Sequence, residues 1–207
     1  MPDPAKTPSR TRLRGWVATA LFAALLCVCA PFAIPIGPVP ITLATLAVYL
    51  IALLQRPERA FLAVLLYVAI GAVGVPVFSG FTGGFDRIVG VTGGFIVGYP
   101  LCAVVVSLFA HLSKSRLRLL FRVLGMLTGT ILLYGVGTVW FILSTGTDRL
   151  SALGLCVVPF LPGDAIKIVL AFFLALFLEK PLSSVLPDAF QSNGTPDPED
   201  EKAEDKK

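Results

Sequence analysis

The sequence predicts an all-α integral membrane protein with six transmembrane helices and both termini in the cytoplasm. Hydrophobic residues make up 56% of the 207-residue chain, charged residues make up only 14%, and basic residues concentrate in alternate loops. Soluble domains carry about 25% charged residues, so this chain leaves no room for a large soluble domain. The apolar runs that are long enough to suggest spans are 15–34, 40–54, 60–76, 91–111, 119–143 and 163–179.

The first apolar run follows a basic N-terminal segment, residues 1–14, and has two interpretations. Basic residues before an apolar run that ends in CVCA are typical of a cleaved signal peptide. Pro31 follows at once and apolar residues continue beyond it, which favours a retained first helix. Ala20 and Ala24 form a small-xxx-small pair in this run, and such pairs allow close packing of a helix from the same chain or from a partner.

The second run, 40–54, is short for a membrane span, which suggests a tilted or incomplete crossing. Proline limits backbone rotation and favours turns. The stretch before the run therefore predicts a stiff, hairpin-like connection outside the membrane, with prolines at Pro31, Pro35, Pro38 and Pro40.

Loop charges give the predicted orientation. With the N-terminus in the cytoplasm, fourteen of the 17 Lys and Arg residues fall in cytoplasmic segments, and only Arg87 and Arg149 fall in outer loops. This asymmetry favours six spans over five or seven, and it explains the net charge of +4 without a nucleic-acid-binding surface. We expect residues 15–181 to form the membrane domain and the charged segment 182–207 to be a disordered cytoplasmic tail.

Several function classes lack their sequence signatures. The chain has no G-x-x-x-x-G-K-[ST] motif for ATP hydrolysis by a P-loop, and no H-E-x-x-H motif for a zinc protease. Its cysteines lie in apolar runs without metal-ligand spacing, and we interpret them as packing residues. We therefore predict no enzyme activity, no bound metal and no cofactor. The cysteines are Cys27, Cys29, Cys102 and Cys156.

The motif FLPGDAIK leads into the sixth run and places Asp164 and Lys167 near its predicted outer end. At positions i and i+3 the two side chains share one helix face. Ionisable residues inside a span normally face the protein interior or a wet cavity, and they mark function. Asp164 would accept hydrogen bonds from ligand N–H groups, and Lys167 would pair with a ligand carboxylate. The structural alternative is that Asp164 caps the helix while Lys167 extends outward.

A glycine-rich stretch, residues 75–100, is the second candidate region. Gly93 and Gly94 open the fourth run, where free backbone N–H groups would bind polar ligand atoms. The same composition also fits a flexible loop followed by a small-residue helix interface. Aromatic side chains in this stretch would wall an apolar ring, and the candidates are Phe85, Phe95 and Tyr99.

Four motifs together resemble the BioY family: PVPITLATL, GVPVFSGF, VGVTGGFIVGY and FLPGDAIK, in this order and spacing. Members of this family are the biotin-specific substrate-binding (S) components of energy-coupling-factor transporters. The resemblance covers roughly residues 16–181, although Val91 replaces a usual proline and Ala44 a common glutamine. It implies an outward-facing biotin pocket in the cell membrane. It also implies two kinds of partner, a transmembrane coupling protein and two cytoplasmic ATPases.

The resemblance also implies roles for single residues. Asp164 would bind the ureido ring of biotin, Lys167 would hold its valerate carboxylate, and Asp86 falls near a polar ureido contact. Ala20 and Ala24 resemble the small-residue face through which S components dock on the coupling protein. Two alternatives stay open: a stand-alone carrier for biotin or another small carboxylate, and a structural membrane protein with an internal Asp–Lys pair.

Overall fold

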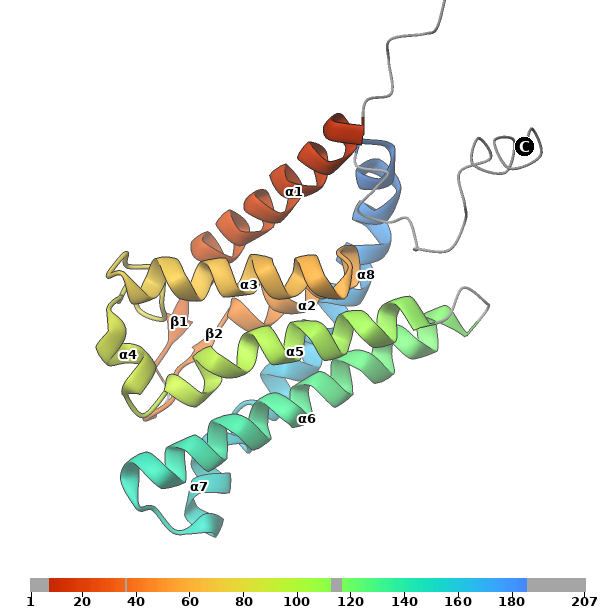
Figure 1. Ribbon diagram of the computed structural model, residues 1–207. Helices are drawn as coiled ribbons and strands as arrows, with labels where there is room; N and C mark the ends of the chain where they lie inside the picture. Colours follow the sequence, from red (N-terminus) through yellow and green to blue (C-terminus); the bar gives the residue numbers. More distant parts are fainter. Residues whose placement is uncertain (1–7, 36, 113–116, 186–207) are drawn as a thin grey trace, which may run out of the picture.

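The computed structural model describes residues 8–35, 37–112 and 117–185. In these ranges the chain forms eight helices and one two-stranded antiparallel ribbon (Figure 1). The helices are α1 (Pro8–Cys29), α2 (Ala44–Leu54), α3 (Pro57–Ala72), α4 (Phe85–Val89), α5 (Gly93–Leu112), α6 (Arg118–Thr145), α7 (Arg149–Cys156) and α8 (Leu161–Val185). The strands are β1 (Ala33–Ile34) and β2 (Ile41–Thr42).

The six longer helices coincide with the six predicted apolar runs, which confirms the helical fold. The short helices α4 and α7 lie in connecting loops and were not predicted. α1 begins at Pro8, so part of the basic segment 1–14 is helical, and α8 continues to Val185 instead of ending near residue 181. Most of the predicted tail, residues 186–207, lies outside the described residues.

Three of the described helices, α5, α6 and α8, are long and apolar enough to cross a membrane. The apolar part of α1, Gly15–Cys29, and the whole of α2 are shorter. At 1.5 Å per residue the 11 residues of α2 extend about 16 Å, roughly half of a hydrocarbon core. The chain is therefore a helical membrane protein in which one central helix is much shorter than the bilayer.

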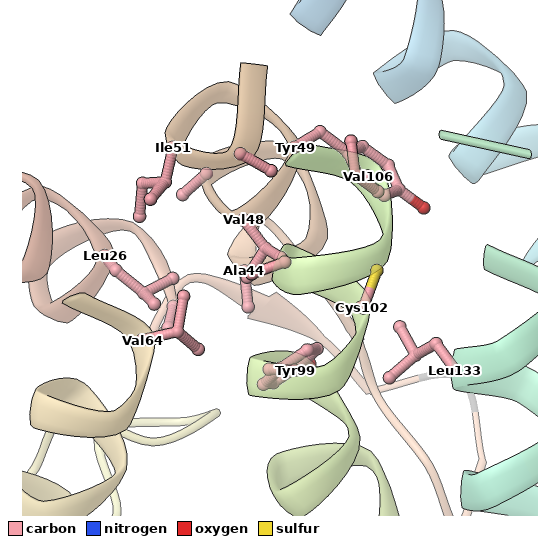
Figure 2. Packing of buried hydrophobic residues seen from close by; sticks show 14 of the residues in the cluster. Leu26, Ala44, Val48, Tyr49, Ile51, Val64, Tyr99, Cys102, Val106 and Leu133 are labelled. Atoms are coloured by element: carbon pink, nitrogen blue, oxygen red, sulfur yellow. The ribbon is translucent and has the colours of Figure 1, made fainter. Parts of the chain in front are cut away.

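The core forms around α2, because an evenly apolar helix can be buried on all sides. Ten of its 11 residues are buried, and it packs against α1, α3, α5 and α8. Figure 2 shows this arrangement, with α2 between side chains of the neighbouring helices. The labelled α2 residues are Ala44, Val48, Tyr49 and Ile51, and their neighbours include Leu26 of α1, Val64 of α3 and Val106 of α5.

The proline-rich stretch forms the predicted hairpin-like connection. Ala33 pairs with Thr42 and Ile34 pairs with Ile41. The segment after α3 folds against this ribbon, because the Gly80 N–H donates to the Pro31 carbonyl at 2.9 Å. The ribbon and this segment together form one end of the helix bundle, where α2, α5 and α8 begin (Figure 1).

The opposite end of the bundle carries a charged cluster between α6 and α8. Glu179 of α8 accepts from both Arg118 and Arg122 of α6, and Arg122 Nη2 lies 3.0 Å from Glu179 Oε2. Arg122 is only 3% exposed, so its charge depends on this carboxylate for compensation. The cluster fixes α6 to α8 at the end that is rich in arginine.

Candidate functional site

A cavity of about 330 Å³ lies at the end of the bundle where α2, α5 and α8 begin. Its walls come from α2, α3, α4, α5, α6 and α8, and from the ribbon and the loop after α3. Cavities of this size are typical of sites for small molecules. Side chains from six helices meet here, so the complete fold is needed to form the cavity.

Asp164 and Lys167 both line this cavity from the first turns of α8. Lys167 Nζ lies 2.8 Å from Asp164 Oδ1, and the residues are only 8% and 3% exposed. The structural alternative for Lys167 is therefore wrong, because its side chain turns inward and does not extend to the membrane surface. Removing two charges from water is costly, so a pair in this position needs further hydrogen bonds.

Two hydroxyl groups from other helices supply these hydrogen bonds. Thr45 of α2 accepts from Lys167 Nζ at 3.0 Å and donates to Asp164 Oδ1 at 3.3 Å. Tyr134 of α6 donates to Asp164 Oδ2 at 2.6 Å. Sequence reasoning missed both residues, and the only signal for them was a hydroxyl group inside an otherwise apolar run. The result is a four-residue polar cluster held by three helices.

Aromatic side chains form much of the remaining wall. Phe95 and Tyr99 line the cavity as predicted. Phe85 does not line it, and this residue is 66% exposed. Phe160, just before α8, stacks on Phe95 with ring centroids 6.4 Å apart. Further aromatic residues in the wall were not predicted, namely Tyr67, Phe78, Tyr134 and Phe160.

Asp86 lies on the cavity wall next to Arg87, on the short helix α4. Both side chains are exposed, so they lie toward solvent and not with the buried Asp–Lys pair. The end of α4 is anchored on α6, since Trp140 Nε1 donates to the Gly90 carbonyl at 3.0 Å. The loop thus brings a second acid and a second base to the cavity.

Comparison with known proteins identifies the family. The sequence profile of the BioY family matches residues 5–184, nearly the whole described chain. The chain belongs to the BioY family. This confirms the resemblance that the four sequence motifs carry.

Two biotin transporters are similar to this chain over most of their length. The chain is 37% identical to biotin transporter BioY2 of Lactococcus lactis over 173 residues, which are 84% of this chain and 94% of that protein. It is 37% identical to biotin transporter BioY of Thermotoga maritima over 169 residues, 81% of this chain and 97% of that protein. A solved structure, the S-component for biotin from an ECF-type ABC transporter, superposes with a TM-score of 0.77 at 25% identity, covering 85% of this chain and 95% of that one.

In this BioY family member, Gly93 and Gly94 are buried but do not line the cavity. The Gly93 N–H donates to the Gly90 carbonyl at 3.0 Å, so it is not free for a ligand. A side chain at Gly93 would meet the Ile88 carbonyl, and one at Gly94 would meet Trp140. The geometry favours the alternative interpretation, in which these glycines allow α5 to pack closely against α4 and α6.

We expect Gly94→Ala to lower the free energy of unfolding by about 1–3 kcal/mol, because the added methyl group overlaps Trp140 of α6. Thermal unfolding in detergent measures the change. Gly135→Ala is the matched control, since Gly135 lies on α6 with open space around it. The control should raise the stability by roughly 0.5–1 kcal/mol, because alanine is the better helix former. Equal effects of the two substitutions would contradict the packing role of Gly94.

Ala20 and Ala24 of this BioY protein are both exposed on α1. The opposite side of α1 is buried, with Ala23 and Leu26 at 0% exposure, and it packs against α2 and α3. No segment in the described ranges covers the two alanines. The alternative in which this pair packs inside the molecule is therefore wrong, and the small-residue face is left for another molecule or for lipid.

Proposed function

We propose that this chain is the membrane subunit that captures biotin for an ATP-driven vitamin importer. The observation that carries the proposal is the buried Asp164–Lys167 pair in an aromatic cavity, in a chain of the BioY family. The similar proteins from Lactococcus lactis and Thermotoga maritima are biotin transporters. The superposable structure is the S-component for biotin of an ECF-type transporter.

The chemistry of biotin matches the groups in the cavity. Biotin combines a cyclic urea, an apolar thioether ring and a carboxylate. Asp164 accepts from a urea N–H group. The third proton of Lys167 is available for the carboxylate, since two protons already bind Asp164 and Thr45. Phe95 and Tyr99 enclose the apolar ring, and Asp86 at the solvent side adds a polar contact to the urea.

The proposal includes six membrane crossings, with both termini in the cytoplasm and the cavity facing outward. The charged cluster around Arg118, Arg122 and Glu179 supports this orientation, because it lies at the end of α6 and α8 remote from the cavity. Cytoplasmic loops are enriched in Lys and Arg, and this end is the arginine-rich one. Biotin then enters from outside, and the loop 76–90 with α4 closes over it.

The energy for transport comes from partner proteins in this proposal. The chain has no P-loop motif, which fits a subunit that does not hydrolyse ATP itself. As the family resemblance implies, two cytoplasmic ATPases hydrolyse ATP and a transmembrane coupling protein connects them to this subunit. The exposed Ala20–Ala24 face of α1 is the docking surface for the coupling protein, because small residues let two helices approach closely. Reorientation of the loaded subunit then releases biotin inside the cell.

Calorimetry with the purified protein in detergent tests biotin capture. We expect saturable biotin binding, and much weaker binding of octanoate, which offers a carboxylate and an apolar chain but no urea. A well-folded protein that does not bind biotin would contradict the proposal and return the pair to an internal structural role. Uptake of biotin by cells without the ATPases would favour the second candidate, a stand-alone carrier that needs the same cavity.

A further inference from the structure

The carboxylate of Asp164 is almost fully occupied before any ligand binds. Its two oxygens offer about four acceptor sites. Lys167 Nζ and the Thr45 hydroxyl occupy Oδ1, at 2.8 and 3.3 Å, and the Tyr134 hydroxyl occupies Oδ2 at 2.6 Å. One acceptor site therefore remains, and it belongs to Oδ2.

The two oxygens are held from different helices. Thr45 on α2 anchors Oδ1, while Tyr134 on α6 anchors Oδ2. A carboxylate otherwise rotates about its last bond with only broad, two-fold preference. The Tyr134 side chain is itself fixed, since the residue is 8% exposed and its ring lies 6.5 Å from that of Phe160. Because both oxygens of the Asp164 carboxylate are anchored, the remaining acceptor site on Oδ2 points in one fixed direction.

Resting on the proposed function, we propose that Tyr134 is a positioning residue that holds the Asp164 carboxylate in one rotation, so that it accepts a single N–H from the ligand. Tyr134 and Asp164 both line the cavity, so the remaining acceptor site is within reach of a bound molecule. Of the two ureido N–H groups of biotin, one binds Asp164 and the other binds a different acceptor. The ligand class is thus a cyclic urea that donates one of its N–H groups to Asp164.

A ligand–protein double-mutant cycle tests this role. Three ligands are used: biotin and its two N-methyl derivatives, each methylated at a different ureido nitrogen. Their binding is measured with the parent and with Tyr134→Phe. We expect Tyr134→Phe to weaken biotin binding at least fivefold. In the parent, methylation of one particular nitrogen weakens binding by a certain factor. This factor should be smaller by about fivefold or more in the variant, because coupled groups give non-additive effects. Methylation of the other nitrogen should carry the same penalty in both proteins.

Tyr49→Phe is the matched control. The Tyr49 hydroxyl is also buried and pairs with Thr130 at 2.6 Å, but Tyr49 does not line the cavity. This variant should leave all three affinities unchanged. Thr45→Val is the second variant, because it removes the anchor on the other oxygen. Thr45→Val should also reduce the loss of affinity caused by methylating that nitrogen. The test therefore does not depend on whether Tyr134→Phe folds.

Two results would overturn the positioning role while leaving biotin capture in place. The first is unchanged biotin binding in Tyr134→Phe. The second is that the binding of biotin and of both methylated derivatives weakens equally. This result indicates a loss of structure without a change in the contacts to the urea. A parent protein that does not bind biotin would instead overturn the proposed function, and the inference with it.

Discussion

We expect Lys167→Ala and Asp164→Asn each to weaken biotin binding by a factor of roughly 30 or more. In the proposed function each substitution removes one charged partner of the ligand, and both residues are less than a tenth exposed. Loss of a buried charge-assisted contact typically reduces binding by about 2–5 kcal/mol, and 1.4 kcal/mol is a factor of ten. Calorimetry on the purified variants measures the change.

The controls for this prediction address folding, because removing one member of a buried ion pair leaves the other uncompensated. The double variant Asp164→Asn with Lys167→Met has no charge in the cluster, so it should unfold at a temperature near that of the parent yet not bind biotin. Lys180→Ala, at the other end of the same helix and exposed, should bind normally. Parent-like affinity in folded Lys167→Ala would place the carboxylate contact elsewhere.

Introducing tryptophan at Ala20 or Ala24 should abolish ATP-driven biotin uptake, with a loss of at least about tenfold, while biotin binding in detergent stays unchanged. Both alanines are exposed on α1, so a large side chain there points away from the rest of the described residues. It would, however, hold a partner helix away from the backbone, and close approach is what small-xxx-small faces provide. Uptake in cells that contain the coupling protein and the ATPases measures the effect.

Ala69→Trp is the matched control for the docking face. Ala69 is likewise an exposed alanine, but it lies on α3 and outside the small-residue pair. This variant should transport at the parent rate. Normal uptake by both α1 variants would show that docking uses another surface. Loss of biotin binding in the same variants would instead show that the substitutions disturb the fold.

Sequence reasoning succeeds for features that a single segment determines. The six apolar runs predict the six longer helices, because a helix pairs its own backbone groups and so depends mainly on its own segment. Asp164 and Lys167 are predicted as neighbours because a spacing of i and i+3 places them on one face of any helix. The prolines between α1 and α2 predict the turn in the same way, since their backbone limits are local.

Only the tertiary structure decides how separate segments meet. Thr45 lies 119 residues from Asp164 in the sequence and Tyr134 lies 30 residues away, yet both bind its carboxylate. Gly94 has the sequence features of a ligand-binding helix start, but α6 packs over it. Phe85 is predicted as a cavity wall and Phe160 is not, while the structure exposes the first and buries the second. Contacts between distant segments depend on how six helices pack together, and no local spacing rule contains that information.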